Sequence, residues 1–185
     1  MKSTILCVIM FIIINTACKK QNNDDKNTLI SEKRYDNEIN TAKSSVKDFG
    51  DEISYADLEL YYLNNKYKKE EILPYTILMV EKHKKFKYSS KVFENLLDLY
   101  TGAELKYDGT NTSLVQYLKN VEKLDGYQRK YFFSFLWIGA REKSMSSVRY
   151  LEILNREGIG MQKNITIADS LKLQLIKLEI ANHVK

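Results

Sequence analysis

The chain has 185 residues, with 29 Lys and Arg against 24 Asp and Glu, and a formal net charge of +5. It holds one proline and seven glycines, too few for an all-β fold with its many turns. The basic residues are scattered, whereas a nucleic-acid-binding protein needs a dense basic stripe and a recognisable module. The composition therefore favours a helical protein that does not bind nucleic acid.

The first residues form a short apolar run that leads to a cysteine. Lys2 gives a positive start, Ile5–Ile14 is an apolar stretch of ten residues, and small and polar residues precede Cys18. A helix needs about 20 apolar residues to span a bilayer, so this stretch is too short. A charged start, a short apolar core and small residues before a cleavage point are typical of a secretory signal peptide. We therefore expect residues 1–17 to be removed.

The end of this segment resembles the signal of bacterial lipoproteins, in which the peptide is cut before a cysteine whose thiol is then acylated. Ala17 and Cys18 match that motif, although Asn15 stands where an aliphatic residue is usual. Cys7 lies in the segment to be removed, so the mature chain keeps one cysteine and forms no internal disulfide. The resemblance implies lipidation of Cys18 and anchoring to a membrane. The alternative is an ordinary secretory peptide with an accidental cysteine.

Residues 18–52 are predicted to form a flexible polar tether. Lys, Gln, Asn, Asp, Ser and Glu predominate between residues 19 and 40, and such a composition buries too little apolar surface to offset the entropy of ordering. The stretch KKQNNDD after Cys18 resembles the export signal of surface-exposed lipoproteins of Bacteroidota-type bacteria, with a generic linker as the alternative. The resemblance implies a place in the cell envelope, at the outer membrane and exposed at the cell surface.

Residues 53–185 are predicted to form one all-α domain of about seven helices. Apolar residues recur at helical spacing, as Leu58, Tyr61 and Tyr62 do at i, i+3 and i+4. Ser54 is a candidate cap for the first helix. The expected helices cover residues 55–66, 74–83, 89–100, 112–123, 127–141, 144–156 and 167–180.

The stretch GYQRKYFFSFLWIGA, residues 126–140, is apolar nearly all round. Such a pattern is typical of a helix buried in the middle of a fold, so its aromatic residues are predicted to be core. A ligand site would need several polar groups among these rings, and we count only Ser134.

Residues 140–175 carry small residues, leucines and a Gly-x-Gly turn in an order that resembles the Sel-like repeat, a branch of the tetratricopeptide superfamily. The matching positions are Ala140, Ser147, Leu151, Leu154, Gly158, Gly160, Lys163, Asn164, Ala168 and Leu171. Glu152 and Asn155 depart from the pattern, and a second block, residues 92–118, repeats it less well. The resemblance implies helical hairpins stacked as a short, irregular α-solenoid, with Gly158 and Gly160 as the turn of the repeat. An irregular helix bundle is the alternative.

Residues that carry chemistry are sparse. The chain has two histidines, His83 and His183, so we predict no metal site, no cofactor and no Ser-His-Asp arrangement. The sequence GIG at residues 158–160 follows no strand and is not a phosphate-binding loop. Four carboxylates leave a glycosidase-like pair open as an alternative. They are Asp57, Glu59, Asp98 and Glu104.

These observations predict a binding protein rather than an enzyme. Helical repeats present surfaces that bind macromolecules, and tyrosines supply contact area with a polar tip. Tyr61, Tyr62 and Tyr67 belong to a tyrosine-rich stretch and are the candidate contacts for a protein partner. Two alternatives stay open: an immunity protein that neutralises a secreted toxin, and a glycan or cell-wall processing enzyme. A neighbouring toxin gene would favour the first, and turnover of an envelope polymer the second.

Overall fold

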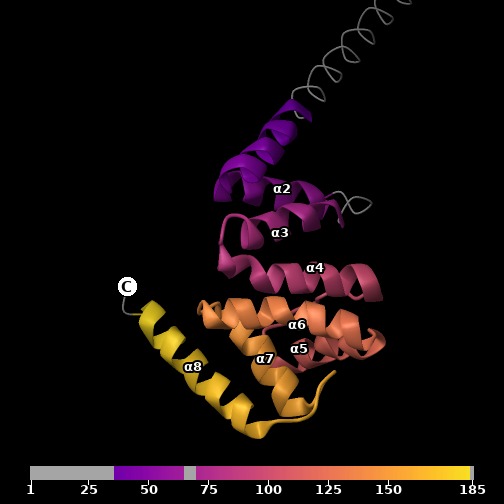
Figure 1. Ribbon diagram of the computed structural model, residues 1–185, viewed down its shortest axis with the longest axis vertical. Helices are drawn as coiled ribbons and strands as arrows, with labels where there is room; N and C mark the ends of the chain where they lie inside the picture. The colour runs from indigo at the N-terminus through magenta and orange to yellow at the C-terminus, as the bar shows by residue number, and fades with distance from the viewer. Residues whose placement is uncertain (1–35, 65–69, 184–185) are drawn as a thin grey trace, which may run out of the picture. The chain divides into compact units, whose positions relative to one another are not determined.

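The computed structural model describes residues 36–64 and 70–183, and this part of the chain is all-α (Figure 1). The chain divides into two compact units, Met1–Ala42 and Lys43–Lys185. The second unit contains α2 (Glu52–Asn64), α3 (Leu73–Glu81), α4 (Ser89–Thr101), α5 (Asn111–Leu118), α6 (Gly126–Arg141), α7 (Met145–Glu157) and α8 (Ile165–His183). Short 3-10 helices of this unit include η2 (Phe86–Tyr88) and η3 (Lys119–Lys123). No strand occurs within the described ranges, which confirms the predicted fold class.

Each of the seven predicted helices occurs, with ends close to those expected. The exception is the helix predicted over residues 112–123, which is α-helical only as far as Leu118 and then continues as η3. A tighter 3-10 turn is common at the C-terminal end of an α-helix, because its i to i+3 bonds use carbonyls that the α-helix leaves free.

An eighth helix lies in the segment that was predicted to be tether. Residues 36–49 are helical, although the flexible tether was expected to extend to residue 52. Ile39, Ala42 and Val46 stand at i, i+3 and i+7 in this polar segment, and Val46 is fully buried. The few apolar residues therefore share one helical face, a pattern that average composition does not register. The signal segment 1–17 and Cys18 lie outside the described residues.

The boundary between this helix and α2 is set by two adjacent residues. Gly50 has φ = +63°, the left-handed conformation that ends helices, and its N–H donates to Val46 O over 3.0 Å. The Asp51 carboxylate accepts from Ser54 N–H at 2.8 Å, so Asp51 caps α2 instead of the predicted Ser54. Hydrogen bonds from Ser54 hold the pKa of Asp51 below its usual value.

Helices that are neighbours in sequence pack on one another. α3 packs on α4, α6 on α7 and α7 on α8, and α4 also packs on α6 (Figure 1). This arrangement is consistent with stacked helical hairpins.

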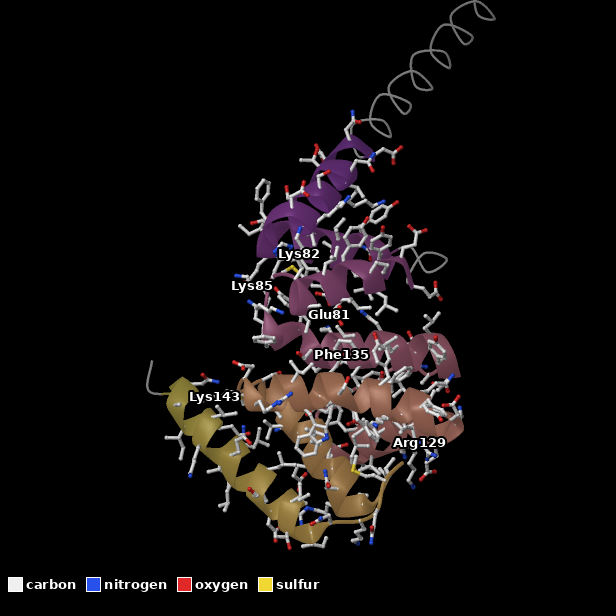
Figure 2. All side chains as sticks on the ribbon, in the orientation of Figure 1. Glu81, Lys82, Lys85, Arg129, Phe135 and Lys143 are labelled. Carbon is white, nitrogen blue, oxygen red and sulfur yellow. The ribbon has the colours of Figure 1, made fainter. Side chains whose placement is uncertain are left out.

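The core lies between α4, α6 and α7. The fully buried ring of Phe93 in α4 has its centroid 6.4 Å from that of Phe133 and 6.0 Å from that of Tyr150. Figure 2 shows Phe135 on the side of α6 that faces α4, and its side chain is 2% exposed. These aromatic residues, from three helices, supply much of the buried apolar area.

Small residues allow α4, α6 and α7 to approach closely at one point. A Cβ atom on Gly139 of α6 would lie 2.8 Å from Ser147 Cβ of α7 and 2.9 Å from Ser89 Cβ of α4. The hydroxyls of Ser89 and Ser147 are buried there without a hydrogen-bond partner in the described structure. The crossing therefore keeps two unsatisfied hydroxyl groups at some cost, and depends on the absence of a side chain at position 139.

The α7–α8 hairpin contains the segment in which the sequence predicts a helical repeat. Gly158 has φ = +73°, and its N–H donates to Leu154 O over 3.0 Å, which ends α7. The backbone carbonyl of Asn155 accepts from Asn164 N–H at 2.9 Å and so ties the end of α7 to the start of α8. The leucines and small residues that were assigned to packing positions are buried. These are Ala140, Ser147, Leu151, Leu154, Ala168 and Leu171.

Candidate binding groove

The helix α6 is held firmly at its start. Asp125 caps it, because its Oδ1 accepts from Tyr127 N–H at 2.8 Å and Gln128 N–H at 2.9 Å. The Gln128 side-chain oxygen in turn accepts from Asp125 N–H at 3.0 Å, which completes a capping box. With its inner face fixed by the buried phenylalanines, α6 is a rigid element on which exposed side chains keep defined positions.

One face of α6 remains open. Lys130, Ser134, Trp137 and Arg141 follow one another at i, i+4, i+7 and i+11, and all four are exposed. The prediction that the aromatic residues of 126–140 are core is confirmed for the three buried phenylalanines. It is wrong for Trp137, which is 37% exposed, and for Tyr127, which is 89% exposed. From Lys130 to Arg141 the helix rises by about 16 Å.

This open face is one wall of a groove of about 600 Å³. The lining residues are Gly126, Arg129, Lys130, Phe133, Ser134, Trp137, Ile138 and Arg141 of α6, with Gly160 and Met161 from the loop after α7. Figure 2 shows Arg129 near the N-terminal end of α6. Two other hollows are smaller, about 250 Å³ and 300 Å³. The groove is within the size range of ligand sites in proteins.

Gly160 brings the loop against α6. Its φ is +66°, and a Cβ atom there would lie 2.5 Å from Val121 Cγ1 and 3.3 Å from both Arg129 Cδ and Phe133 Cζ. Another residue type would be strained at this φ and would also collide with its neighbours. The glycine of the repeat turn therefore also shapes the groove.

The groove is basic and partly aromatic. Arg129, Lys130 and Arg141 line it, and none of its ten lining residues, all of them described by the structure, is acidic. Within the described residues no carboxylate forms an ion pair with these three cations. Trp137 lies one helical turn from Arg141 and two turns from Lys130. The groove therefore favours a ligand that combines negative charge with an apolar group.

The tyrosines predicted as partner contacts have different environments. Tyr62 is 1% exposed, and its hydroxyl donates to Glu71 Oε2 at 3.3 Å. Tyr61 is half-buried, with its ring centroid 5.0 Å from that of Tyr62. Tyr67 lies outside the described residues. Tyr62 is therefore a core residue, and its ring has no surface to offer a partner.

A network of carboxylates and tyrosines lies around α4. Glu94 Oε1 accepts from Tyr150 OH, and Asp98 Oδ1 accepts from Tyr117 OH, each over 2.8 Å. Burial is the main cause of the raised pKa values of both tyrosines, so at neutral pH their hydroxyls stay protonated and donate. These bonds link α4 to α5 and α7.

Burial also raises the pKa of Glu94, against the opposing effects of the Lys91 charge and the Tyr150 hydrogen bond. The folded-state pKa lies above the unfolded value of about 4.5, so Glu94 contributes stability at lower pH that is lost as the pH rises through the raised pKa. We expect Glu94→Gln to be more stable than the parent at pH 7, with the advantage shrinking as the pH falls toward 4. Urea unfolding of both proteins at a series of pH values tests this. A variant that is less stable at every pH by a constant amount would contradict it.

The other residues considered for chemistry are dispersed. Asp98 and Glu104 line one hollow, whereas Glu59 forms an ion pair with Lys91 at 3.0 Å and Asp57 is exposed on α2. The His83 Nε2 atom lies 3.2 Å from Lys47 O.

The described residues contain neither a metal-binding cluster nor a helix that could cross a membrane. No group of three or more His, Cys, Asp or Glu side chains in these ranges is arranged to hold a metal ion. Across the same ranges, every helix is too short or too polar to cross a membrane.

The groove was not predicted from the sequence, although the polar residues that line it share one face of the predicted helix. Lys130, Ser134 and Arg141 share one face of the predicted helix, but the rings around them dominated the pattern. The second wall, Gly160 and Met161, is remote in sequence, and no local pattern places it there.

Comparisons with protein-family models, with curated proteins and with solved structures give no match for this chain.

Proposed function

We propose that this protein is a lipid-anchored envelope protein whose helical domain binds a protein partner through the groove along α6. The partner presents an acidic segment that carries at least one apolar side chain. The resemblance of residues 140–175 to Sel-like repeats supports this role, because helical repeats serve as binding surfaces.

The observation that carries the proposal is Trp137 placed among Arg129, Lys130 and Arg141 without an acidic neighbour in the groove. Trp and Arg are enriched among the residues that dominate binding energy in interfaces. A half-exposed tryptophan offers a large apolar face, and the cations attract an acidic segment from a distance and fix its orientation. Because the exposed side chains stand on a rigid helix, less conformational entropy is lost when a partner binds.

The first test concerns binding and uses the single tryptophan of the chain as its reporter. Residues 18–185 with Cys18→Ser are titrated with an acidic peptide of alternating Glu and Leu, and with a matched Lys and Leu peptide. We expect the acidic peptide alone to shift Trp137 emission. By calorimetry, Trp137→Ala should weaken binding of the acidic peptide by about 2 kcal/mol, as loss of a hot-spot aromatic does.

The matched control for this test is Tyr127→Ala. Tyr127 is aromatic, 89% exposed and on the same helix, but it does not line the groove. It should leave the affinity nearly unchanged, whereas Arg141→Glu should abolish the preference for the acidic peptide. Equal binding of both peptides, or equal losses in Trp137→Ala and Tyr127→Ala, would refute the groove as the site.

The second test concerns the anchor, which rests on Cys18 and the short apolar run before it. Cys18→Ser in the full chain should abolish acylation, because the thiol is the acceptor, and should release the protein from the membrane fraction. Labelling with a fatty-acid analogue and fractionation of cells measure both effects. If the parent takes up no label and the variant stays in the membrane, the lipoprotein assignment fails.

A further inference from the structure

The helix α2 is apolar on two faces. Tyr55, Leu58 and Tyr62 are buried on the inner face. On the outer face Ile53, Leu60 and Leu63 are 75%, 59% and 64% exposed, and they stand at i, i+7 and i+10. The helix α2 therefore carries two apolar stripes, of which only the inner one is packed within the domain. We call the three exposed residues of the outer stripe the α2 face.

The helix α8 has the same property. Ala168 and Leu171 are buried and Leu175 and Leu178 pack against the core, so this side of the helix faces α7. The opposite side carries Leu173, Ile176 and Ile180, at i, i+3 and i+7, which are 61%, 43% and 60% exposed. These three residues are the α8 face.

The charges beside the two faces are opposite in sign. On α2, Glu52 forms an ion pair with Lys87 and Glu59 with Lys91, which leaves the exposed carboxylate of Asp57 next to the stripe. The helix α2 contains no basic residue.

On α8 the acidic residues are the ones that are paired. Asp169 forms an ion pair with Arg156 at 2.9 Å, and Glu179 one with Arg149 at 3.6 Å. The exposed Lys172 and Lys177 form no ion pair within the described residues, and they flank the stripe on its two sides.

We propose that copies of this protein associate head to tail, with the α2 face of one copy packed on the α8 face of the next. Pairing unlike faces buries both apolar stripes and brings Asp57 close to Lys172 or Lys177. Pairing like faces would set Asp57 against Asp57, or lysines against lysines, and such juxtapositions are unfavourable. A contact between two different surfaces leaves one unpaired face at each end of the assembly. The assembly can therefore grow beyond a dimer, unless the rotation that relates successive copies closes it into a ring.

The experiment uses two full-length copies with different tags, expressed together. One carries Leu60→Cys, the other Ile176→Cys, and intact cells are treated with a short, membrane-permeant bismaleimide. We expect a cross-linked species with both tags, at several times the yield obtained when both copies carry Leu60→Cys or both carry Ile176→Cys. The pair without introduced cysteines gives the background from Cys7 and Cys18. When Lys119→Cys, at an exposed position on η3, replaces one of the two introduced cysteines, the cross-linked yield is that of random encounters.

A charge swap provides the second arm. Asp57→Lys on the copy with Leu60→Cys should lower the mixed yield several-fold, and Lys172→Glu with Lys177→Glu on the other copy should restore it. Labelling with a monofunctional maleimide verifies that each introduced thiol is accessible. If the same-residue pairs cross-link as well as the mixed pair, or the mixed pair does not exceed the Lys119→Cys yield, head-to-tail association is refuted.

Discussion

Replacing Gly139 with valine should destabilise the domain by about 3 kcal/mol or more, at the upper end of what overpacking costs. The reason is the crossing of three helices at this residue. A Cβ atom alone would lie 2.8 Å from Ser147 Cβ and 2.9 Å from Ser89 Cβ, distances that real Cβ atoms essentially never show. Both neighbours are Cβ atoms, which cannot rotate away because each is bonded directly to the backbone of a packed helix.

The matched control is Gly126→Val in the same helix. A Cβ atom at Gly126 meets nothing within 4 Å, and this residue is the first of α6. The control should change stability by about 0.5 kcal/mol or less. Urea denaturation of both variants, followed by circular dichroism, measures the difference. If the two valines cost the same, the close crossing of α4, α6 and α7 is not present in solution.

Tyr62→Ala should cost about 3 to 5 kcal/mol of stability, as loss of a fully buried aromatic side chain does. Tyr62 is 1% exposed, and the Lys43 ammonium lies 5.8 Å from its ring centroid. Removing the ring leaves a cavity between α2 and its neighbours, and it leaves Glu71 without the hydroxyl that donates to it. Thermal and urea unfolding measure the loss.

Tyr62→Phe and Tyr61→Ala separate the possible causes. Tyr62→Phe keeps the ring and removes one part-buried hydrogen bond, so it should cost about 1 kcal/mol. Tyr61→Ala removes a half-buried ring, and its cost should be clearly below that of Tyr62→Ala. If Tyr62→Ala had the stability of the parent, Tyr62 would not be a core residue, and it would again be a candidate contact for a protein partner.

The positions of the helices could be predicted from the sequence because the signals are local. Apolar residues at i, i+3 and i+4 mark a helix whatever packs on it, and Gly102 and Gly158 end α4 and α7 at φ = +66° and +73°. The helix over residues 36–49 was missed because its few apolar residues lie within a polar composition. Such a helix depends on what covers Val46 more than on intrinsic propensity.

The sequence by itself determined the fold class, the approximate positions of seven helices and the residues of the α7–α8 hairpin that pack inward. Only the tertiary structure decided which aromatic residues are covered. Tyr61 and Tyr62 differ by one step of about 100° around α2, and the position of the packing partner selects the buried one. Along α6, phenylalanines and Trp137 contribute alike to the apolar pattern, but the packed helices cover the phenylalanines and leave Trp137 exposed in the wall of the groove. The periodicity of a sequence indicates on which face of a helix an apolar side chain lies. Whether that side chain is buried depends on segments, remote in sequence, that pack against this face.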